Sequence, residues 1–380
     1  MVRIRLTRSI TVISMCATLA GAALAWTSSA GAATRVASPY LPSLGTPSQI
    51  ASTVPANGDV NPYGIAIVPS TTGHLVKGAT LVSNFNASSN VQGTGSTIVQ
   101  VLPSKQVRLF ANLTVVARGH RCPGGVGLTT ALGILPGGFV VVGSIGSGRA
   151  GALPVPNPAG CLIVVDRNGH VAEVWSGPDL NGPWDMATTS TATTAQLYVA
   201  DALTRPGSQH GAGASGSGEI VRLNVALHGA SAPTVTSSTV IGRGFAWHAN
   251  LATFLMGPTG IAIARNGTAY VVETLGNRVM AISHASTRST AVSAAGSVLS
   301  KGGVLNSPLG AAVAPNGDVL VVNGADGYAV EISPAGKQVA KALLVPNGAG
   351  ALFGLVVTPG GTSLQFVNDG ANAIDAAVTH

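Results

Sequence analysis

Charged residues are scarce in this chain of 380 residues. Asp, Glu, Lys and Arg together make up 9% of the sequence, against about a quarter in an ordinary soluble domain. Ser, Thr, Asn and Gly must therefore cover much of the surface. Because few carboxylates can be held in ion pairs, acidification has little to disrupt, and we expect the protein to resist unfolding by acid. An acidic habitat and a generally Gly-, Ser- and Thr-rich set of secreted proteins both explain this composition.

Several sequence motifs that carry chemistry are also missing. No helical hydrophobic period of useful length occurs after the first 30 residues, which argues against a helical fold. The chain has no G-x-S-x-G nucleophile elbow and no pair of histidines with metal-ligand spacing. The Gly/Ser stretch at residues 215–218 is not followed by the Lys-Ser/Thr of a phosphate loop. No catalytic residue is identified by motif.

The N-terminus has the pattern of a secretory signal. Arg3, Arg5 and Arg8 precede an apolar stretch at residues 10–25, and small residues at 30–32 form a cleavage site. A membrane anchor is the alternative, but no second apolar span follows. We therefore expect residues 1–32 to be removed, residues 33–48 to form a linker, and the mature protein to be secreted without a membrane span.

The charge of the mature chain argues against nucleic acid as a partner. Cleavage leaves 17 Lys and Arg against 13 Asp and Glu, a net charge of +4 rather than +7. The basic residues are scattered, and no basic stripe with interleaved aromatics occurs. A protein, small-molecule or glycan ligand is the expected partner.

Two cysteines, Cys122 and Cys161, remain after cleavage. In an oxidising compartment two remaining thiols commonly pair, and the bond would close a loop of about 40 residues. The alternative is a reactive thiol, although neither cysteine lies in a known nucleophile signature. We predict a disulfide.

The most prominent feature that is present is an internal repeat of turn, Gly, apolar strand, Asn-Gly or Pro-Gly turn and second apolar strand. It is clearest at residues 257–273 and 307–323. Sheet units repeated at tens of residues indicate a radial or stacked array. Six copies can be aligned on the residue that opens the first strand, with spacings of 67, 54, 75, 50 and 44: Gly64, Ala131, Asp185, Gly260, Gly310 and Gly354.

The spacings fit one four-stranded blade per copy, which predicts an all-β, six-bladed β-propeller over residues 49–380. The sixth copy ends about one strand short. The segment at residues 49–54, which precedes the first copy, can supply the missing strand and remove two exposed sheet edges.

The phrase Pro-x-Gly-Ile-Ala, Asn-Gly, Tyr-Val-Val-Glu, Gly-Asn-Arg-Val in the fourth copy resembles the NHL repeat. NHL-like and TolB-like proteins of this type form six-bladed propellers, so the resemblance implies the same fold over roughly residues 60–380. It implies little about function, because related propellers include protein-binding modules, lyases and metal-dependent lactonases.

Polar residues that close the second strand of each copy should converge around the central channel. Carboxylate and amide oxygens suit a hard cation, so we predict Ca²⁺ as a candidate cofactor. The set is similar to the ligands of gluconolactonase-like propellers. The alternative is that each side chain caps its own turn. The candidate ligands are Glu273, Asp201, Asp185, Asn84, Asn323 and Asn368.

Long insertions are expected to crowd the same face, at residues 86–96, 144–160, 203–218 and 239–256. Trp184, Trp247 and His248 should lie there as a binding face, although both tryptophans could instead pack beneath the loops. The sequence favours a binding or scaffold module that uses this loop-rich face. A divalent-metal-dependent hydrolase or lyase at the channel mouth is the alternative.

Overall fold

A computed structural model describes residues 38–113, 122–150, 153–203, 215–250 and 253–380. The expected signal peptide lies outside these residues. The described part is built from strands, with three short 3-10 turns, η1 (Leu41–Ser43), η2 (Ala295–Ser297) and η3 (Asp369–Ala371), and no α-helix. None of the described segments is a helix that could span a bilayer.

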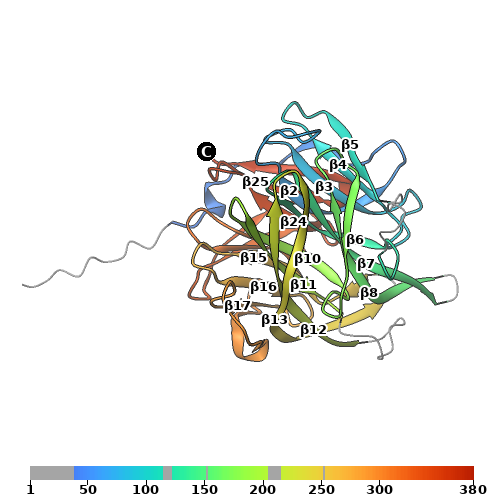
Figure 1. The fold of residues 1–380 in the computed structure, drawn as a ribbon. Coiled ribbons are helices and arrows are strands. Elements are labelled where there is room, and N and C mark those ends of the chain that lie inside the picture. Colours follow the sequence, from blue (N-terminus) through green and yellow to red (C-terminus); the bar gives the residue numbers. More distant parts are fainter. Residues whose placement is uncertain (1–37, 114–121, 151–152, 204–214, 251–252) are drawn as a thin grey trace, which may run out of the picture. The chain divides into compact units, whose positions relative to one another are not determined.

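The strands form six sheets, antiparallel except for one short parallel pair in the third, which confirms the predicted six-bladed propeller (Figure 1). The first blade contains β2 (Val60–Ile67), β3 (Thr80–Asn86), β4 (Thr97–Val101) and β5 (Val107–Asn112). The second contains β6 (Leu128–Leu135), β7 (Phe139–Ala150), β8 (Leu153–Val165) and β9 (Val171–Trp175). The fourth contains β15 (Pro258–Ile263), β16 (Ala269–Glu273), β17 (Arg278–Ile282) and β19 (Val298–Lys301). The fifth contains β20 (Pro308–Val313), β21 (Val319–Asn323), β22 (Tyr328–Ile332) and β23 (Gln338–Leu343).

The sixth blade joins the two ends of the propeller. It contains β24 (Leu352–Val357), β25 (Ser363–Asn368) and β26 (Ala373–Val378), and its fourth strand is β1 (Ser48–Ser52). Gln49 pairs with Asp375 and Ser52 with Ala373. The predicted completion of the sixth blade by the segment before the first copy is therefore confirmed, and the β26 edge is covered.

The third blade is larger than the four-stranded sheet we predicted. To β10 (Pro183–Ser190), β11 (Thr194–Asp201), β12 (Ser215–His228) and β13 (Ser231–Asn250) it adds β14 (Phe254–Met256) and β18 (Val292–Ser293). Much of the insertion expected as a loop at residues 239–256 is strand, because β13 continues along the full length of β12 and then turns back into β14. The insertion at residues 144–160 likewise extends the β7–β8 hairpin (Figure 1).

Apolar side chains fill the spaces between neighbouring blades. Separate buried clusters lie between each adjacent pair, including the sixth and first blades, where Val82 and Val99 meet Val367 and Ile374. The inner strands β2, β6, β10, β15, β20 and β24 contact one another in that order, and β24 returns to β2.

The repeated glycine is explained by this ring of inner strands. A Cβ on Gly310 would lie 2.3 Å from the carbonyl oxygen of Phe353 in the next blade. Glycines at the same position of the first, fourth and sixth blades meet a neighbouring carbonyl equally closely. Only a residue without a side chain permits such an approach of two backbones.

The segment before β1 is fixed to the fifth blade. Glu331 Oε1 accepts a hydrogen bond from Tyr40 N at 2.6 Å, and Oε2 accepts one from Leu41 N at 2.7 Å. Glu331 is fully buried, so these two backbone donors satisfy a carboxylate that would otherwise be costly to bury.

Candidate functional site

A cavity of about 370 Å³ lies at one mouth of the channel. Its lining comes from the starts of inner strands, the ends of second strands with the loops after them, and the β13–β14 connection. Three other hollows are more open: one of about 440 Å³ lies at the β10–β11 turn of the third blade, and two of about 470 and 830 Å³ lie along β13. The polar members of the mouth lining are Asn61, Gln92, Thr130, Thr253, Ser307 and Asp369.

Four aromatic residues line this cavity together with Leu128, Met256 and Leu309: Tyr63, Phe85, Trp184 and Phe353. Tyr63 stacks on Phe353 with ring centroids 5.0 Å apart and meets Trp184 edge to face at 5.8 Å. Phe85 lies edge to face with both Tyr63 and Phe353. These are the offset and T-shaped arrangements that aromatic rings prefer.

The polar atoms of the aromatic group are satisfied within the protein. Trp184 Nε1 donates to the Tyr63 hydroxyl at 2.6 Å, and that hydroxyl donates to the carbonyl of Thr259 at 3.1 Å. Burial, followed by the nearby Asp185 carboxylate, raises the pKa of Tyr63 well above its usual value. Tyr63 therefore stays a neutral phenol, and the rings present an apolar surface to the cavity.

Asp369 supplies the only carboxylate among the described residues that line the cavity. It opens η3, directly after β25, and is half-buried. With its nitrogen facing Asp369, the Asn61 amide donates to Oδ1 at 2.7 Å and accepts from Asn86 Nδ2 at 2.7 Å. Burial raises the pKa of Asp369 to about 7.

The two buried carboxylates among the predicted metal ligands have protein partners. Asp201, at the end of β11, accepts from the backbone N–H groups of Asn181 at 2.7 Å and Gly182 at 2.8 Å. Glu273, at the end of β16, accepts from Ala246 N at 2.6 Å and forms an ion pair with Arg278. Desolvation raises the pKa of Asp201 to about 8.

Asp185 lies lower in the channel, on β10. Its Oδ1 accepts from Met186 N at 2.8 Å, and its Oδ2 accepts from Ile261 N of the fourth blade at 2.9 Å. Desolvation raises its pKa to about 7, and the two backbone donors oppose that rise. The carboxylate thus links two adjacent inner strands.

The three predicted amide ligands bond to nearby loops or turns. Asn323 accepts from Asn306 N at 3.0 Å and donates to the carbonyl of Val304. Asn368 accepts from Ala371 N and donates to Asp375. Asn84 donates to the carbonyl of Thr53 at 2.8 Å, and its Oδ1 has no hydrogen-bond partner among the described residues.

The described parts of the chain contain no group of three or more His, Cys, Asp or Glu residues arranged to hold a metal. Each of the six predicted ligands makes at least one contact of the turn-capping or strand-linking kind. A calcium site formed by these residues remains a prediction.

The predicted binding face is divided between the cavity and the core. Trp184 lines the cavity, whereas Trp247 on β13 is fully buried beneath it. The alternation of β13 turns Phe245, Trp247 and Ala249 inward, and half-buried His248 lies between them in sequence. A Cβ on Gly216 of β12 would meet the Trp247 ring at 2.7 Å, so the two strands pack closely at this point.

Sequence reasoning missed Tyr63, Phe85 and Phe353. A usable signal was present for two of them, because Tyr63, Trp184 and Phe353 each directly precede the residue on which the copies are aligned. The residue at that position lines the cavity in five of the six blades, so its aromatic occupants in three copies predict an aromatic cavity there. Phe85 is one residue beyond the predicted position Asn84.

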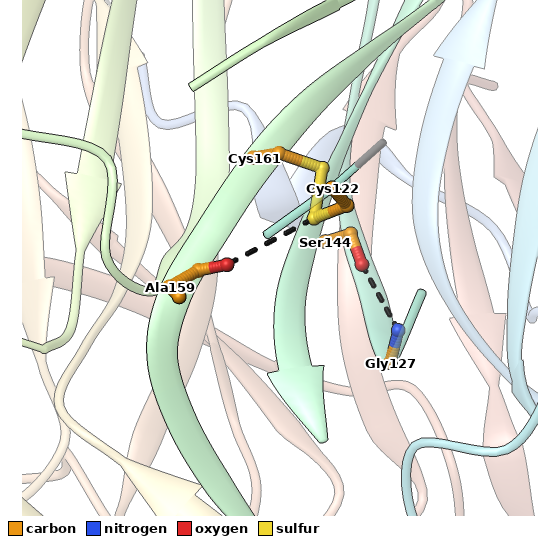
Figure 2. Close-up of a disulfide and its surroundings, with 5 residues drawn as sticks. All are labelled: Cys122, Gly127, Ser144, Ala159 and Cys161. Atoms are coloured by element: carbon orange, nitrogen blue, oxygen red, sulfur yellow. Dashed lines mark hydrogen bonds between the residues drawn. A yellow bond between two sulfur atoms is a disulfide. The ribbon is translucent and has the colours of Figure 1, made fainter. Parts of the chain in front are cut away.

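The predicted disulfide is confirmed. Cys122 and Cys161 are bonded, with Cα atoms 5.4 Å apart, within the usual range for a disulfide (Figure 2). Next to the bond, Ser144 Oγ accepts a hydrogen bond from Gly127 N at 3.0 Å (Figure 2). The disulfide fixes the segment that leads into β6 against β8.

No family model matches this chain, and no curated protein matches it. Among solved structures, it is similar to a gluconolactonase from Xanthomonas campestris, with 12% identity, a TM-score of 0.53, and coverage of 85% of this chain and 88% of that one. It is also similar to virginiamycin B lyase from Staphylococcus aureus solved with quinupristin, with 13% identity, a TM-score of 0.48, and coverage of 86% and 83%. These neighbours are six-bladed propeller enzymes, and at such identity the likeness shows the fold alone.

Proposed function

We propose that this protein is a secreted, NHL-like propeller that binds a small molecule, or an exposed side group of a larger partner, in the aromatic cavity at the channel mouth. The cavity with its four converging rings is the observation that supports this function. Ligand sites are typically concave and mostly apolar, with a few placed polar groups, and this cavity has that composition.

Phe353 offers the available aromatic surface of the cavity, because Tyr63, Phe85 and Trp184 are only 2%, 4% and 4% exposed. Phe353 is half-buried, and the polar atoms of Tyr63 and Trp184 are already paired with protein groups. A ligand can therefore cover ring surface without breaking a hydrogen bond of the protein, so burial of apolar area is not offset by lost polar contacts.

The alternative, a metal-dependent hydrolase or lyase, needs carboxylate oxygens that are free to coordinate an ion. Asp201 and Glu273 would have to give up strong hydrogen bonds to backbone donors, and Glu273 also its ion pair with Arg278. This cost favours the binding function. Secretion is supported by the disulfide, the form in which paired cysteines persist in oxidising compartments.

A ligand screen by thermal shift, with aromatic, terpenoid and glycan compounds, tests the proposal on the secreted protein. We expect apolar or aromatic compounds to raise the melting temperature, and Phe353→Ala to weaken their binding at least tenfold. Leu343→Ala is the matched control, since Leu343 is 42% exposed on the outer strand β23 and should not affect binding.

Two results would contradict the proposal. One is ligand binding that Phe353→Ala leaves unchanged. The other is calcium-dependent hydrolysis of lactones that Glu273→Gln abolishes while the fold, followed by circular dichroism, stays intact.

A further inference from the structure

The described lining of the cavity carries negative charge only. Of the described residues that line the cavity, Asp369 is the only one that carries a charge, and none of them is Lys or Arg. The described residues form ion pairs at Asp166, Glu219 and Glu273, and none at Asp369. Within the described parts of the chain, the Asp369 carboxylate therefore has an amide partner, Asn61, and no cationic partner.

Among the described residues, the elements packed against Asp369 supply no positive charge. Strands β2 and β24 pack against η3, which carries Asp369. They contain no charged residue, and Tyr63 is their only titratable side chain. The adjoining β25 has no titratable group, and β26 contributes only Asp375, whose Oδ2 accepts a hydrogen bond from Asn368.

The aromatic rings reinforce the preference for positive charge. The face of an aromatic ring is electrically negative, and cations within about 6 Å of it are attracted, most strongly when both are shielded from water. Tyr63, Phe85, Trp184 and Phe353 line the same cavity as Asp369. An anionic ligand would meet both the carboxylate and the ring faces unfavourably.

We propose that the cavity takes an organic ammonium ligand, with its apolar body against the aromatic rings and its cationic group at Asp369. This inference rests on the proposed binding function and adds the chemical class of the ligand. The raised pKa of Asp369 agrees with it, because a carboxylate buried without a counter-cation holds its proton until a cation replaces it.

Three probes of nearly the same shape and different charge test this inference by isothermal titration calorimetry: 2-phenylethylammonium, 2-phenylethanol and phenylacetate. At pH 8 we expect the ammonium to bind at least tenfold more tightly than the alcohol and the carboxylate to bind most weakly. Ammonium affinity should fall as the pH is lowered from 8 to 6, because Asp369 becomes protonated, while alcohol affinity should not change.

Asp369→Asn should lower the affinity for the ammonium to that for the alcohol and remove its pH dependence. Unchanged affinity for 2-phenylethanol in this variant shows that the cavity is still formed. Asp166→Asn is the matched control, because it makes the same charge change in the β8–β9 turn, outside the cavity.

The outcomes separate the two proposals. Equal binding of the ammonium and the alcohol, unaffected by Asp369→Asn, would overturn the cationic ligand and leave the apolar binding site in place. Tighter binding of phenylacetate would also overturn it. No binding of any probe at millimolar concentration would contradict the binding function itself.

Discussion

The inner strands of the third and fifth blades contact the next blade in different ways. In the fifth blade Gly310 lets its strand approach the sixth blade until the backbones touch, with no room for a Cβ beside the Phe353 carbonyl. In the third blade the equivalent residue is Asp185, and its carboxylate reaches across to Ile261 N of the fourth blade. One junction is closed by backbone contact and the other by a side chain.

This difference explains why some copies of the repeat are easy to see and others are not. Where two backbones touch, the sequence must keep glycine, and the first, fourth, fifth and sixth copies do. The second and third copies have Ala131 and Asp185 instead. The second blade also has the disulfide, and the third has two additional strands. The degenerate copies are stabilised by other means.

Removing the disulfide should have the largest effect on the difference between regular and degenerate blades. Cys122 and Cys161 are 39 residues apart, and the chain-entropy relation gives roughly 4 kcal/mol for a loop of this length. We expect the Cys122→Ser, Cys161→Ser double variant to lose about that much unfolding free energy in guanidinium titrations. A loss below about 1 kcal/mol would show that the second blade does not depend on the bond.

Gly310→Ala should have the next largest effect. Its Cβ would lie 2.3 Å from the backbone oxygen of Phe353, which cannot turn aside as a flexible side chain can, so the fifth and sixth blades must separate. Overpacking of this kind costs about 1–3 kcal/mol, and we expect the upper part of that range. Gly296→Ala is the control, because nothing lies within 4 Å of its Cβ position. Equal stability of the two variants would refute the backbone-contact explanation.

Asp185→Asn should have the smallest effect, and that effect depends on pH. Burial raises the pKa of Asp185 from its ordinary value of 3.8 to about 7 in the folded protein. At a pH between these two values, the folded state keeps a proton that the unfolded chain has lost. Stability from this group is therefore lost as the pH rises from about 4 to 7.

The amide of Asp185→Asn cannot ionise, but its nitrogen cannot accept a hydrogen bond, so either Met186 N or Ile261 N loses its partner. We expect the variant to be less stable than the wild type at pH 4 and to gain on it as the pH rises to 8, with a shallower pH dependence of unfolding. Asp201, with a pKa of about 8, is still present in this variant, so the unfolding free energy of the variant should also fall as the pH rises. A variant less stable than the wild type at pH 8 would show that the link to Ile261 outweighs the burial of charge.

The sequence predicts the fold more completely than it predicts the site. The glycine phrase is visible because it reports a contact that every regular blade must make, and the short sixth copy reveals that β1 must close the ring. The partners of Asp201 are less accessible to prediction. They are the backbone N–H groups of residues 181–182, and only the folded loop brings them to its carboxylate.

The aromatic cavity shows a different limit. The polar residues at strand ends were predicted as metal ligands because their chemistry suits a cation, yet their side chains form hydrogen bonds that hold the loops in place. Two of the aromatic residues that line the cavity, Tyr63 and Phe353, precede the repeated glycine, a position whose role becomes clear only when the inner strands are known to converge. Residues 239–256 were expected as a loop because they lack the repeat phrase, but pairing with β12 makes most of them strand.

The most direct test of the binding site is a crystal structure of the secreted protein soaked at pH 8 with 2-phenylethylammonium. The proposal predicts one molecule in the channel-mouth cavity, with its ring against Phe353 and Tyr63 and its nitrogen within hydrogen-bond distance of Asp369. An empty cavity in crystals whose contacts leave it open, or a ligand bound only elsewhere, would contradict it.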